Sequence, residues 1–525
     1  MAYKYCDWTN GNDLSGDGTA ALPYKSIEKA LQTLVGGDEA RVAKSPAHTA
    51  LSGTLNFLDG SNSVATSVNL TGSLAINDFI GKNVDDMCWW SISDITASTI
   101  TLHTVYSGTT EIVSGYKMGA HDLGTAAAAG TVLDRTNGRD GASASSRLKI
   151  SGGWNLGTET QDSETFFKQT GSSIYGIGLE LTGTSDYIEI EKLHYARCYR
   201  GIYIAASSSG SYFHDLGMYR CYQGLYMLTN GKYFKWGGTI RVSQSTNYGI
   251  YWYYNNVYAD QIDGSDCILE FRACSCGIFI GSGNTYYKRI LSTRPTGGSG
   301  IHLAYGDNIR IGELEIIHAT TGIYTSSCDC CGTIIGKYIA TDVGTAIQMP
   351  RYPIVVNHYI PTAVGTDFGT GGSGVSESGI AHVRVQRYGN VNYTARMFFL
   401  GVGYIYQDSS QNARSTRCLR FAPSIIGTGL FWQVGNVKCM NTNLDIILSV
   451  YIKKDNQLNG SVWLAGFVLG RMVAAWEEKT TTTSYAQYSI TIPHADLVMT
   501  EYVELQVRVN GTAGNVYVDD FSVSQ

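Results

Sequence analysis

One short motif recurs through the middle of the chain at nearly constant spacing: a glycine, an aliphatic residue, a variable residue and an apolar residue. Successive glycines are separated by 25, 23, 25, 28, 23, 22 and 22 residues. Self-similarity at a period of about 20 to 50 residues is the signature of a repeat architecture, in which each repeat contributes one structural unit. The copies begin at Gly176, Gly201, Gly224, Gly249, Gly277, Gly300, Gly322 and Gly344.

Short segments between these motifs alternate apolar and polar residues, as Tyr187–Ile190 and Leu314–Ile317 do. Alternation with a period of two, bounded by Gly, Asn, Asp or Ser, predicts β-strands. Several short strands per repeat predict coils that stack at the inter-strand spacing of about 4.8 Å. We therefore expect an all-β chain built on a right-handed parallel β-helix. A leucine-rich repeat would need its Leu and Asn ladder, and a propeller would need about 40 residues per blade.

Composition supports this expectation and excludes other classes. Charged residues make up 16% of the 525 residues, and the chain has 61 Gly, 8 Pro and 36 Tyr. Few charges and few prolines exclude a charged or Pro-rich disordered chain, and the aromatic content favours β-surfaces over helices. A net charge of −6 gives no electrostatic reason to bind nucleic acid.

Two further features bear on where the protein is made. The first 30 residues contain no apolar core of a signal peptide, and the most apolar later stretch, Val462–Trp476, is interrupted by Gly466, Gly470 and Arg471. We expect neither export by a signal peptide nor membrane insertion. The 12 Cys are then expected to be mostly reduced thiols, made in a cytoplasm.

The register of the repeat assigns side chains to faces. If the first and third residues after each glycine point inward, the second points outward, because strand side chains alternate. An outward aromatic ladder follows, and three roles for it stay open: stiffening of the coils, a platform for glycan binding, and a subunit interface. Its members are Tyr203, Tyr226, Tyr251, Phe279, His302 and Tyr324.

Cysteines follow the same register. Cys198, Cys221 and Cys274 each lie three residues before a repeat glycine, which predicts a buried internal stack. A zinc site would have to combine cysteines whose spacing does not form two C-x-x-C pairs, so we expect no metal and no cofactor. The cysteines in question are Cys274, Cys276, Cys328, Cys330 and Cys331.

Residues 1–50 are expected to form an amino-terminal cap and the first coil. A strand at Tyr3–Asp7 leads through the turn Gly16–Thr19 into Pro23–Ile27, and this order resembles the start of pectate-lyase-like β-helix proteins. Ser26 is placed to cap a short helix that runs on to Leu34 and covers the open apolar end of the solenoid.

Residues 51–118 interrupt the pattern with five short strand-like segments, the last at Tyr106–Thr110, and predict an inserted small β-domain. Their order resembles a module of bacteriophage tail and other virion proteins. We assign residues 119–366 to the parallel β-helix, with a return loop up to Ser146 and the solenoid resuming near Arg147.

The Gly/Ser-rich tract within residues 367–384 predicts a linker. Residues 385–525 contain strand-like runs that end in Val516–Val523, and they resemble carbohydrate-binding β-sandwich (jelly-roll) modules. In such modules one of the paired aspartates can hold calcium. Without identifiable further ligands, we interpret Asp519 and Asp520 as capping a turn.

Catalysis of polysaccharide cleavage would need paired carboxylates at suitable separation. Asp260, Asp263 and Asp266 cluster in the longest, 28-residue coil, where they form either a pocket or a solvated turn. Glu270 and Glu315 share one register position but lie two coils apart, at about 10 Å. We take these five carboxylates as the candidate catalytic residues.

The resemblance to phage β-helix proteins implies a structural virion protein: a tailspike, a fibre or a capsid-surface decoration. It also implies contacts with other virion proteins, a homotrimer, and binding of a bacterial surface polysaccharide, in a particle made in the host cytoplasm. The alternative is a depolymerase, a hydrolase or lyase of capsule or lipopolysaccharide. A bacterial adhesin is a third class, which the expected lack of an export signal disfavours.

Overall fold

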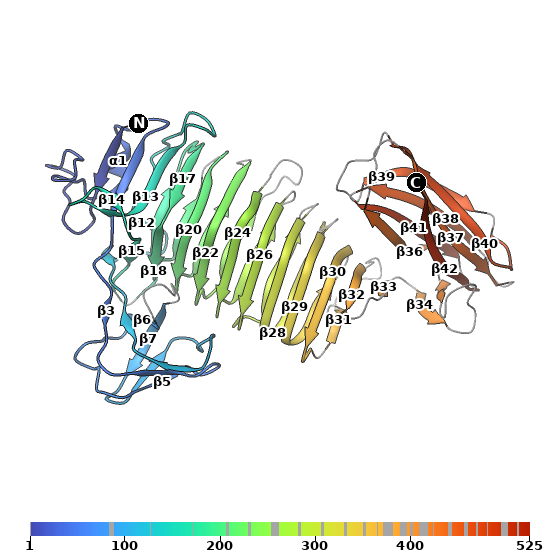
Figure 1. Ribbon diagram of the computed structural model, residues 1–525, viewed down its shortest axis with the longest axis horizontal. Coiled ribbons are helices and arrows are strands. Elements are labelled where there is room, and N and C mark those ends of the chain that lie inside the picture. Colours follow the sequence, from blue (N-terminus) through green and yellow to red (C-terminus); the bar gives the residue numbers. More distant parts are fainter. Residues whose placement is uncertain are drawn as a thin grey trace. The chain divides into compact units, whose positions relative to one another are not determined.

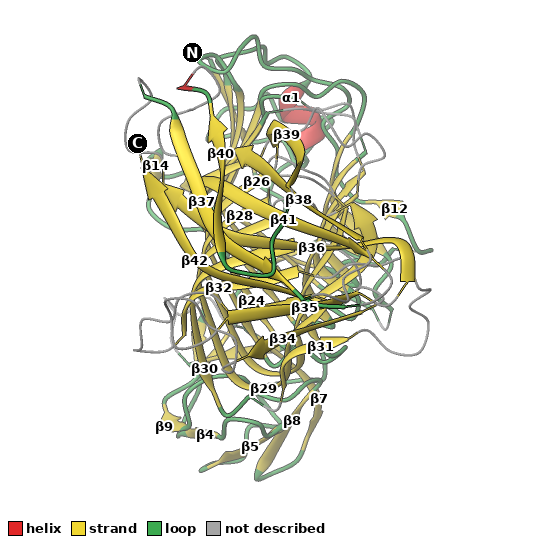
Figure 2. Ribbon diagram, turned by 90° about the vertical axis from the view of Figure 1, so that its right-hand side faces the viewer, coloured by secondary structure: helices red, strands yellow, loops and turns green. Residues whose placement is uncertain are grey.

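The computed structural model describes residues 2–524 apart from a set of gaps. Strands dominate it (Figure 2). No helix in the described residues is long and apolar enough to cross a membrane. The gaps fall at residues 83–88, 127, 172, 206–208, 229–232, 254–261, 282–284, 306–308, 330–332, 350–352, 365, 371–381, 389–395, 400–402, 409–417, 424, 439–443, 456–459, 469–470, 480, 495–501 and 512–513.

A parallel β-solenoid confirms the predicted fold class. Its 25-stranded sheet stacks equivalent strands of successive coils side by side (Figure 1). The glycine motifs lie in one stack: β16 (Gly176–Leu181), β19 (Arg200–Ile204), β21 (Gln223–Leu228), β23 (Tyr248–Tyr253), β25 (Cys276–Gly281) and β27 (Ser299–Tyr305). Further stacks include β2 (Glu39–Ala43), β13 (Leu148–Asn155), β17 (Ile188–Glu191), β18 (Leu193–Ala196), β20 (Tyr212–Tyr219), β22 (Phe234–Ser243), β24 (Ile262–Arg272), β26 (Thr285–Thr293) and β28 (Ile309–Asp329).

The repeated glycines have a steric cause. A Cβ at Gly224 would lie 2.5 Å from the carbonyl oxygen of Gly249, and a Cβ at Gly249 would lie 2.5 Å from that of Gly277. Real Cβ atoms do not approach backbone so closely, so each coil needs glycine where it meets the next. The residues on either side, such as Ile202 and Ile204, are fully buried and fill the solenoid.

Each coil turns one corner at a residue in the left-handed backbone conformation. These residues have φ between 49° and 59°, and the N–H of each donates to a carbonyl of the next coil at 2.7 to 2.9 Å. The side chain that follows points into the core, where Cys198, Cys221 and Cys274 are buried free thiols. The corner positions are Arg197, Arg220, Gln244, Ala273 and Arg294.

At the amino terminus, β1 (Tyr3–Cys6) pairs in parallel with β2, and helix α1 (Ile27–Leu31) follows. The Ser26 side chain accepts a hydrogen bond from the Lys29 N–H, as the sequence predicted. Asp134, which the sequence did not indicate, accepts from the N–H groups of Ile27 and Glu28 at 2.8 and 2.9 Å. Burial outweighs these hydrogen bonds and raises the pKa of Asp134 to about 7.

The inserted segment forms an 8-stranded antiparallel sheet with its own buried cluster, which includes Trp90. The prediction of a strand at Tyr106–Thr110 is wrong. These residues lie outside any strand, and the next strand of the sheet begins at Glu111. The strands are β3 (Thr49–Ala50), β4 (Leu55–Phe57), β5 (Ser63–Thr66), β6 (Phe79–Gly81), β7 (Trp90–Ile95), β8 (Thr99–Leu102), β9 (Glu111–Val113) and β10 (Tyr116–Lys117).

The return segment was predicted as a loop, but two of its strands already belong to the solenoid. β11 (His121–Asp122) and β12 (Thr131–Val132) pair in parallel with β15 (Thr165–Lys168) and β16. The solenoid therefore resumes before Arg147. Towards the other end, β31 (Thr366–Thr370) includes the start of the predicted linker, and residues 371–381 of that tract lie outside the described residues.

The carboxyl-terminal part is a β-sandwich of a 5-stranded and a 4-stranded sheet. Asp519 and Asp520 lie within a strand, where Asp519 is opposite Tyr451, so the prediction that they cap a turn is wrong. One sheet contains β34 (Gly403–Asp408), β35 (Cys418–Pro423), β37 (Ile446–Lys454), β40 (Ala486–Ile492) and β42 (Val516–Ser524); the other contains β36 (Ile425–Lys438), β38 (Gly460–Val468), β39 (Arg471–Lys479) and β41 (Tyr502–Gly511).

The internal thiols are expected to be unreactive in the native protein. A hydrogen bond with Cys221, together with burial, raises the pKa of the Cys198 thiol, and burial raises the pKa of Cys274 to about 12. Because the thiolate is the reactive form, an added thiol reagent should modify Cys198, Cys221 and Cys274 only after denaturation. Mass-spectrometric mapping of the modified peptides checks this, and labelling within minutes without denaturant would contradict it.

Candidate functional site

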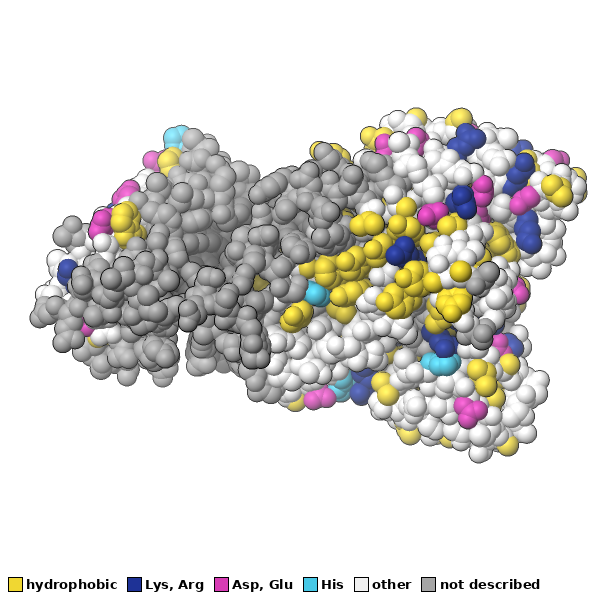
Figure 3. Space-filling view, turned by 180° about the vertical axis from the view of Figure 1, so that it is seen from behind, with side chains coloured by type: hydrophobic (Ala, Val, Ile, Leu, Met, Phe, Trp, Pro, Cys, Tyr) yellow, Lys and Arg dark blue, Asp and Glu magenta, His cyan; other side chains and the backbone are white. Residues whose placement is uncertain are grey.

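The outward side chains of the glycine motifs form a continuous column, which we call the aromatic strip. Tyr203, Tyr226, Tyr251, Phe279 and His302 are register partners in successive strands, and Tyr324 continues the column. In the space-filling view, apolar side chains gather in a band along one face of the solenoid (Figure 3). The strip is thus a surface several coils long.

Ring geometry within the strip is regular. Tyr226 and Tyr251 stack with centroids 5.0 Å apart and planes 5° apart, and Tyr251 stacks on Phe279 at 4.6 Å and 20°. Towards the other end, His302 meets Phe279 and Tyr324 edge-on at 4.7 and 4.8 Å. Each ring covers part of its neighbour. Phe279 is buried, with 7% of its surface exposed, and the other rings of the strip are partly exposed.

A second row of tyrosines widens the strip. Tyr199 and Tyr222 stack at 5.0 Å and 4°, and 37% of Tyr222 is exposed. Tyr248 contacts both Tyr251 and Phe279, with centroids 5.1 and 5.3 Å away. The surface is therefore broader than a single column of rings.

Arg200 places a positive charge at one end of the aromatic strip. The guanidinium carbon of Arg200 lies 4.3 Å from the Tyr203 ring centroid and 3.8 Å from that of Tyr226, and its Nε donates to Gln223 Oε1 at 3.1 Å. Such cation–π contacts hold a guanidinium flat against the rings. Burial lowers the pKa of His302 to about 4, so this residue adds no charge at neutral pH.

The structure describes two of the three candidate aspartates of the longest coil. Asp260 lies outside the described residues, while Asp263 and Asp266 are exposed in β24. Asp263 accepts a hydrogen bond from the Ser265 N–H at 3.1 Å and lies between Lys235 and Tyr286 in the register of the neighbouring coils.

Glu270 and Glu315 take part in ion pairs. Glu270 Oε2 lies 3.0 Å from Arg241 Nε, and its other oxygen pairs with Arg272. Burial opposes ionisation of Glu270, but the two arginines outweigh it and lower the pKa. Glu315 pairs with Arg289 at 2.6 Å, and the register through Leu291 places it two coils from Glu270. Both carboxylates thus link neighbouring coils.

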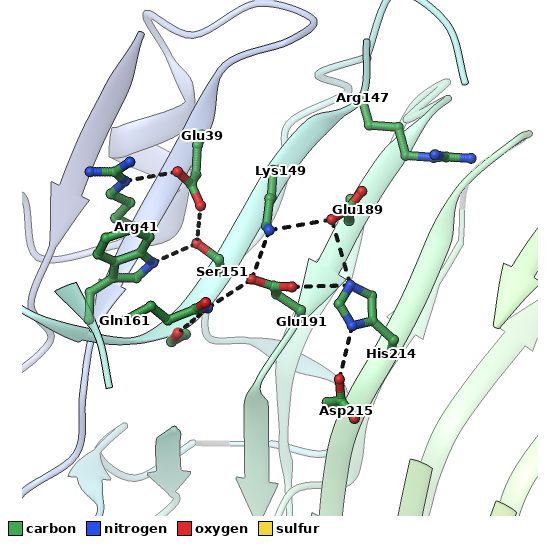
Figure 4. Close-up of polar contacts among 12 residues, drawn as sticks. Glu39, Arg41, Arg147, Lys149, Ser151, Gln161, Glu189, Glu191, His214 and Asp215 are labelled. Carbon is green, nitrogen blue, oxygen red and sulfur yellow. Dashed lines mark hydrogen bonds and ion pairs between the residues drawn. The ribbon is translucent and has the colours of Figure 1, made fainter. Parts of the chain in front are cut away.

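A polar cluster on β13, β17 and β20 was not predicted from the sequence (Figure 4). Lys149 Nζ lies 2.8 Å from Glu191 Oε1 and 3.5 Å from Glu189 Oε1. His214 Nε2 lies 3.2 Å from Glu191 Oε2, and its Nδ1 lies 3.1 Å from Asp215 Oδ2. These five residues, here called the carboxylate–histidine cluster, join three successive coils.

The protonation state of His214 decides what the carboxylate–histidine cluster can do. Burial lowers the pKa of the imidazole, but the hydrogen bond to Asp215 and the nearby carboxylates of Glu189 and Glu191 outweigh burial and raise the pKa to about 9. His214 therefore holds two protons at neutral pH and can act as an acid. Glu189, Glu191 and His214 place ligand atoms within 4.8 Å of one another, but the bound proton and the Lys149 ammonium compete with a metal cation there.

The sequence did contain a signal for this cluster. Glu189 and Glu191 alternate with isoleucines in β17, which marks two carboxylates on one outward face. Finding His214 above Glu191 requires the pairing of β17 with β20, and no glycine motif marks that pairing.

Comparisons with known proteins give fold likenesses of low identity. No family model matches the chain, and no curated protein matches it. Pectate lyase Pel9A is 11% identical over 75% of this chain and 79% of its own, with a TM-score of 0.35. A "Family 16 Carbohydrate Binding Module-2" is 16% identical over 23% of this chain and 85% of its own, with a TM-score of 0.18. A family 30 carbohydrate-binding module of Clostridium thermocellum is 15% identical over 24% and 87%, with a TM-score of 0.19.

The raised pKa of His214 predicts a pH-dependent stability. Its folded-state pKa of about 9 exceeds the unfolded value of about 6.5, so the stabilisation is complete below pH 6.5 and is lost as the pH rises through 9. Urea unfolding of the wild type should therefore show a falling free energy of unfolding between these pH values. His214→Gln should remove most of that fall. A variant with the same pH profile as the wild type would show that the cluster does not bind the proton.

Proposed function

We propose that this chain is a structural bacteriophage virion protein, a tailspike, fibre or capsid-surface decoration, that binds a host-surface polysaccharide along the aromatic strip. The observation that carries the glycan part is the strip itself, whose rings repeat at centroid separations of 4.6 to 5.4 Å. Aromatic rings bury the apolar faces of sugar rings and leave the hydroxyl edges in water. A repeating aromatic surface suits a repeating polymer better than a small molecule.

The rigidity of the strip supports this role. Its rings stand on strands whose inward neighbours, such as Ile250 and Ile278, are fully buried, and each ring is held by the next. A binding surface ordered before its ligand arrives loses less conformational entropy on binding. Arg200 and the hydroxyl groups of Tyr199 and Tyr222 add polar groups that can orient a sugar polymer.

The virion part of the proposal rests on the resemblance of residues 51–118 to a module of bacteriophage tail and other virion proteins. A homotrimer packed along the solenoid, with contacts to other virion proteins, belongs to the same proposal. A subunit interface is the competing use of the aromatic strip, because tyrosine-rich, charge-poor surfaces also suit protein contacts.

The glycan proposal predicts that Tyr226→Ala combined with Tyr251→Ala weakens binding to capsule or lipopolysaccharide of a host strain at least ten-fold, since about 1.4 kcal/mol of lost contact suffices. Calorimetric titration of the purified full-length protein measures this. Tyr286→Ala is the matched control, because Tyr286 is 39% exposed on another strand stack and should leave the affinity unchanged.

Light scattering of the same variants separates the two uses of the strip. If the wild type binds none of the polysaccharides and the double variant converts an oligomer into a monomer, the strip is a subunit interface and the glycan proposal fails. If the affinity falls while the molar mass stays constant, the strip contacts the ligand directly.

A second candidate function is a polysaccharide depolymerase, and the carboxylate–histidine cluster favours it. His214 can donate a proton to the leaving oxygen while the neighbouring Glu191 carboxylate accepts one from the sugar. Reducing ends released from capsule or lipopolysaccharide are the readout. His214→Asn and Glu191→Gln should abolish release by this cluster, whereas loss of release with Asp260→Asn, Asp263→Asn or Asp266→Asn would place catalysis in the longest coil.

A further inference from the structure

Two arginines occupy the same corner position on neighbouring coils. Arg197 and Arg220 have φ of 59° and 50°, and the N–H of Arg197 donates to the Tyr219 carbonyl at 2.9 Å. Their backbones therefore lie one coil apart, about 4.8 Å. Arg197 is only 3% exposed, while Arg220 is partly exposed.

Among the described residues, the hydrogen-bond partners of these guanidinium groups are neutral. Arg197 Nη2 donates to the Gly171 carbonyl at 2.7 Å, and its buried Nε has no hydrogen-bond partner. Arg220 Nη1 donates to Asn77 Oδ1 at 2.6 Å and to Ser91 Oγ at 3.0 Å. Within the described ranges, neither arginine forms an ion pair with a carboxylate.

A third corner arginine, unlike these two, is paired with a carboxylate. Arg294 lies at the same corner further along the solenoid, and its Nη2 and Nε lie 2.7 and 3.1 Å from the carboxylate of Asp59 in the inserted domain. The same domain presents an amide and a hydroxyl to Arg220 instead. The positive charge is thus neutralised at one corner and left uncompensated at two others.

The electrostatics of nearby groups agree with this geometry. Burial and the charge of Arg197 lower the pKa of Arg220 to about 10. His103 is exposed, and partial desolvation, followed by the charges of Arg220 and Arg197, lowers its pKa to about 4. A buried cation without a counter-charge costs free energy, and a bound anion offsets that cost.

We propose that Arg197 and Arg220 form an oxyanion-binding site where the inserted domain meets the solenoid. The buried Nε of Arg197 has no hydrogen-bond partner, and Arg220 is partly exposed, so an anion would reach the two guanidinium groups from the Arg220 side. Planar guanidinium groups match the oxygens of phosphate, sulfate and carboxylate. The anion is a free phosphate or an acidic substituent of a polysaccharide, and the site stands independently of the aromatic strip.

Calorimetric titration and thermal unfolding of the full-length protein test this site, with sodium phosphate, sodium sulfate and sodium glucuronate as probes. Sodium chloride at matched ionic strength is the control for screening. One oxyanion should bind at one site per chain and raise the unfolding midpoint, because a ligand that binds only the folded state stabilises it. Preference for phosphate indicates the free ion, and preference for glucuronate indicates an acidic sugar.

Variants assign the effect to the two arginines. Arg220→Gln should weaken oxyanion binding at least ten-fold, whereas Arg294→Gln, at the same corner but paired with Asp59, should leave it unchanged. No binding to the wild type beyond the chloride control would overturn the proposal, and so would full binding by Arg220→Gln. If Arg220→Gln fails to fold, Arg220→Lys takes its place, and the wild-type titration decides by itself whether a site exists.

Discussion

The hydrogen-bond ladder between neighbouring coils is the constraint on which the rest of the solenoid depends. It brings equivalent backbone atoms so close that a Cβ at Gly224 or Gly277 would meet a carbonyl oxygen of the next coil at 2.5 or 2.6 Å. Glycine is therefore required once per coil, and the pairing cannot slip without moving the inward isoleucines to the outside. The ladder fixes each side chain directly above its counterpart.

Stacking in fixed register turns a sequence position into a column of side chains, and each column has its own chemistry. The position after Ile202 becomes the aromatic strip. Another column contains Arg241, Glu270 and Glu315, with Leu291 between the two glutamates, and the ion pairs of these glutamates link coils. The left-handed corner becomes the edge on which the inserted domain docks, through Arg220, Gln244 and Arg294.

The glycine spacing alone was enough to predict the solenoid, the outward aromatic column and the buried cysteines, because all three share the register that glycine sets. Contacts between strands without such a marker were not predictable. The carboxylate–histidine cluster joins residues up to 66 positions apart, from Lys149 to Asp215, and docking of the inserted domain joins Asp59 to Arg294. The β42 aspartates were placed in a turn because their local residues favour turns, whereas pairing with β37 keeps them in a strand.

A density map of the full-length protein with a bound oligosaccharide of the host surface polysaccharide, obtained by crystallography or electron microscopy, tests the central claim most directly. The claim is that register-fixed aromatic rings on the solenoid form the glycan contact. The account predicts sugar density lying against the partly exposed rings of Tyr203, Tyr226 and Tyr251. Density for the sugar only elsewhere, with the aromatic strip covered by another protein chain, would contradict it.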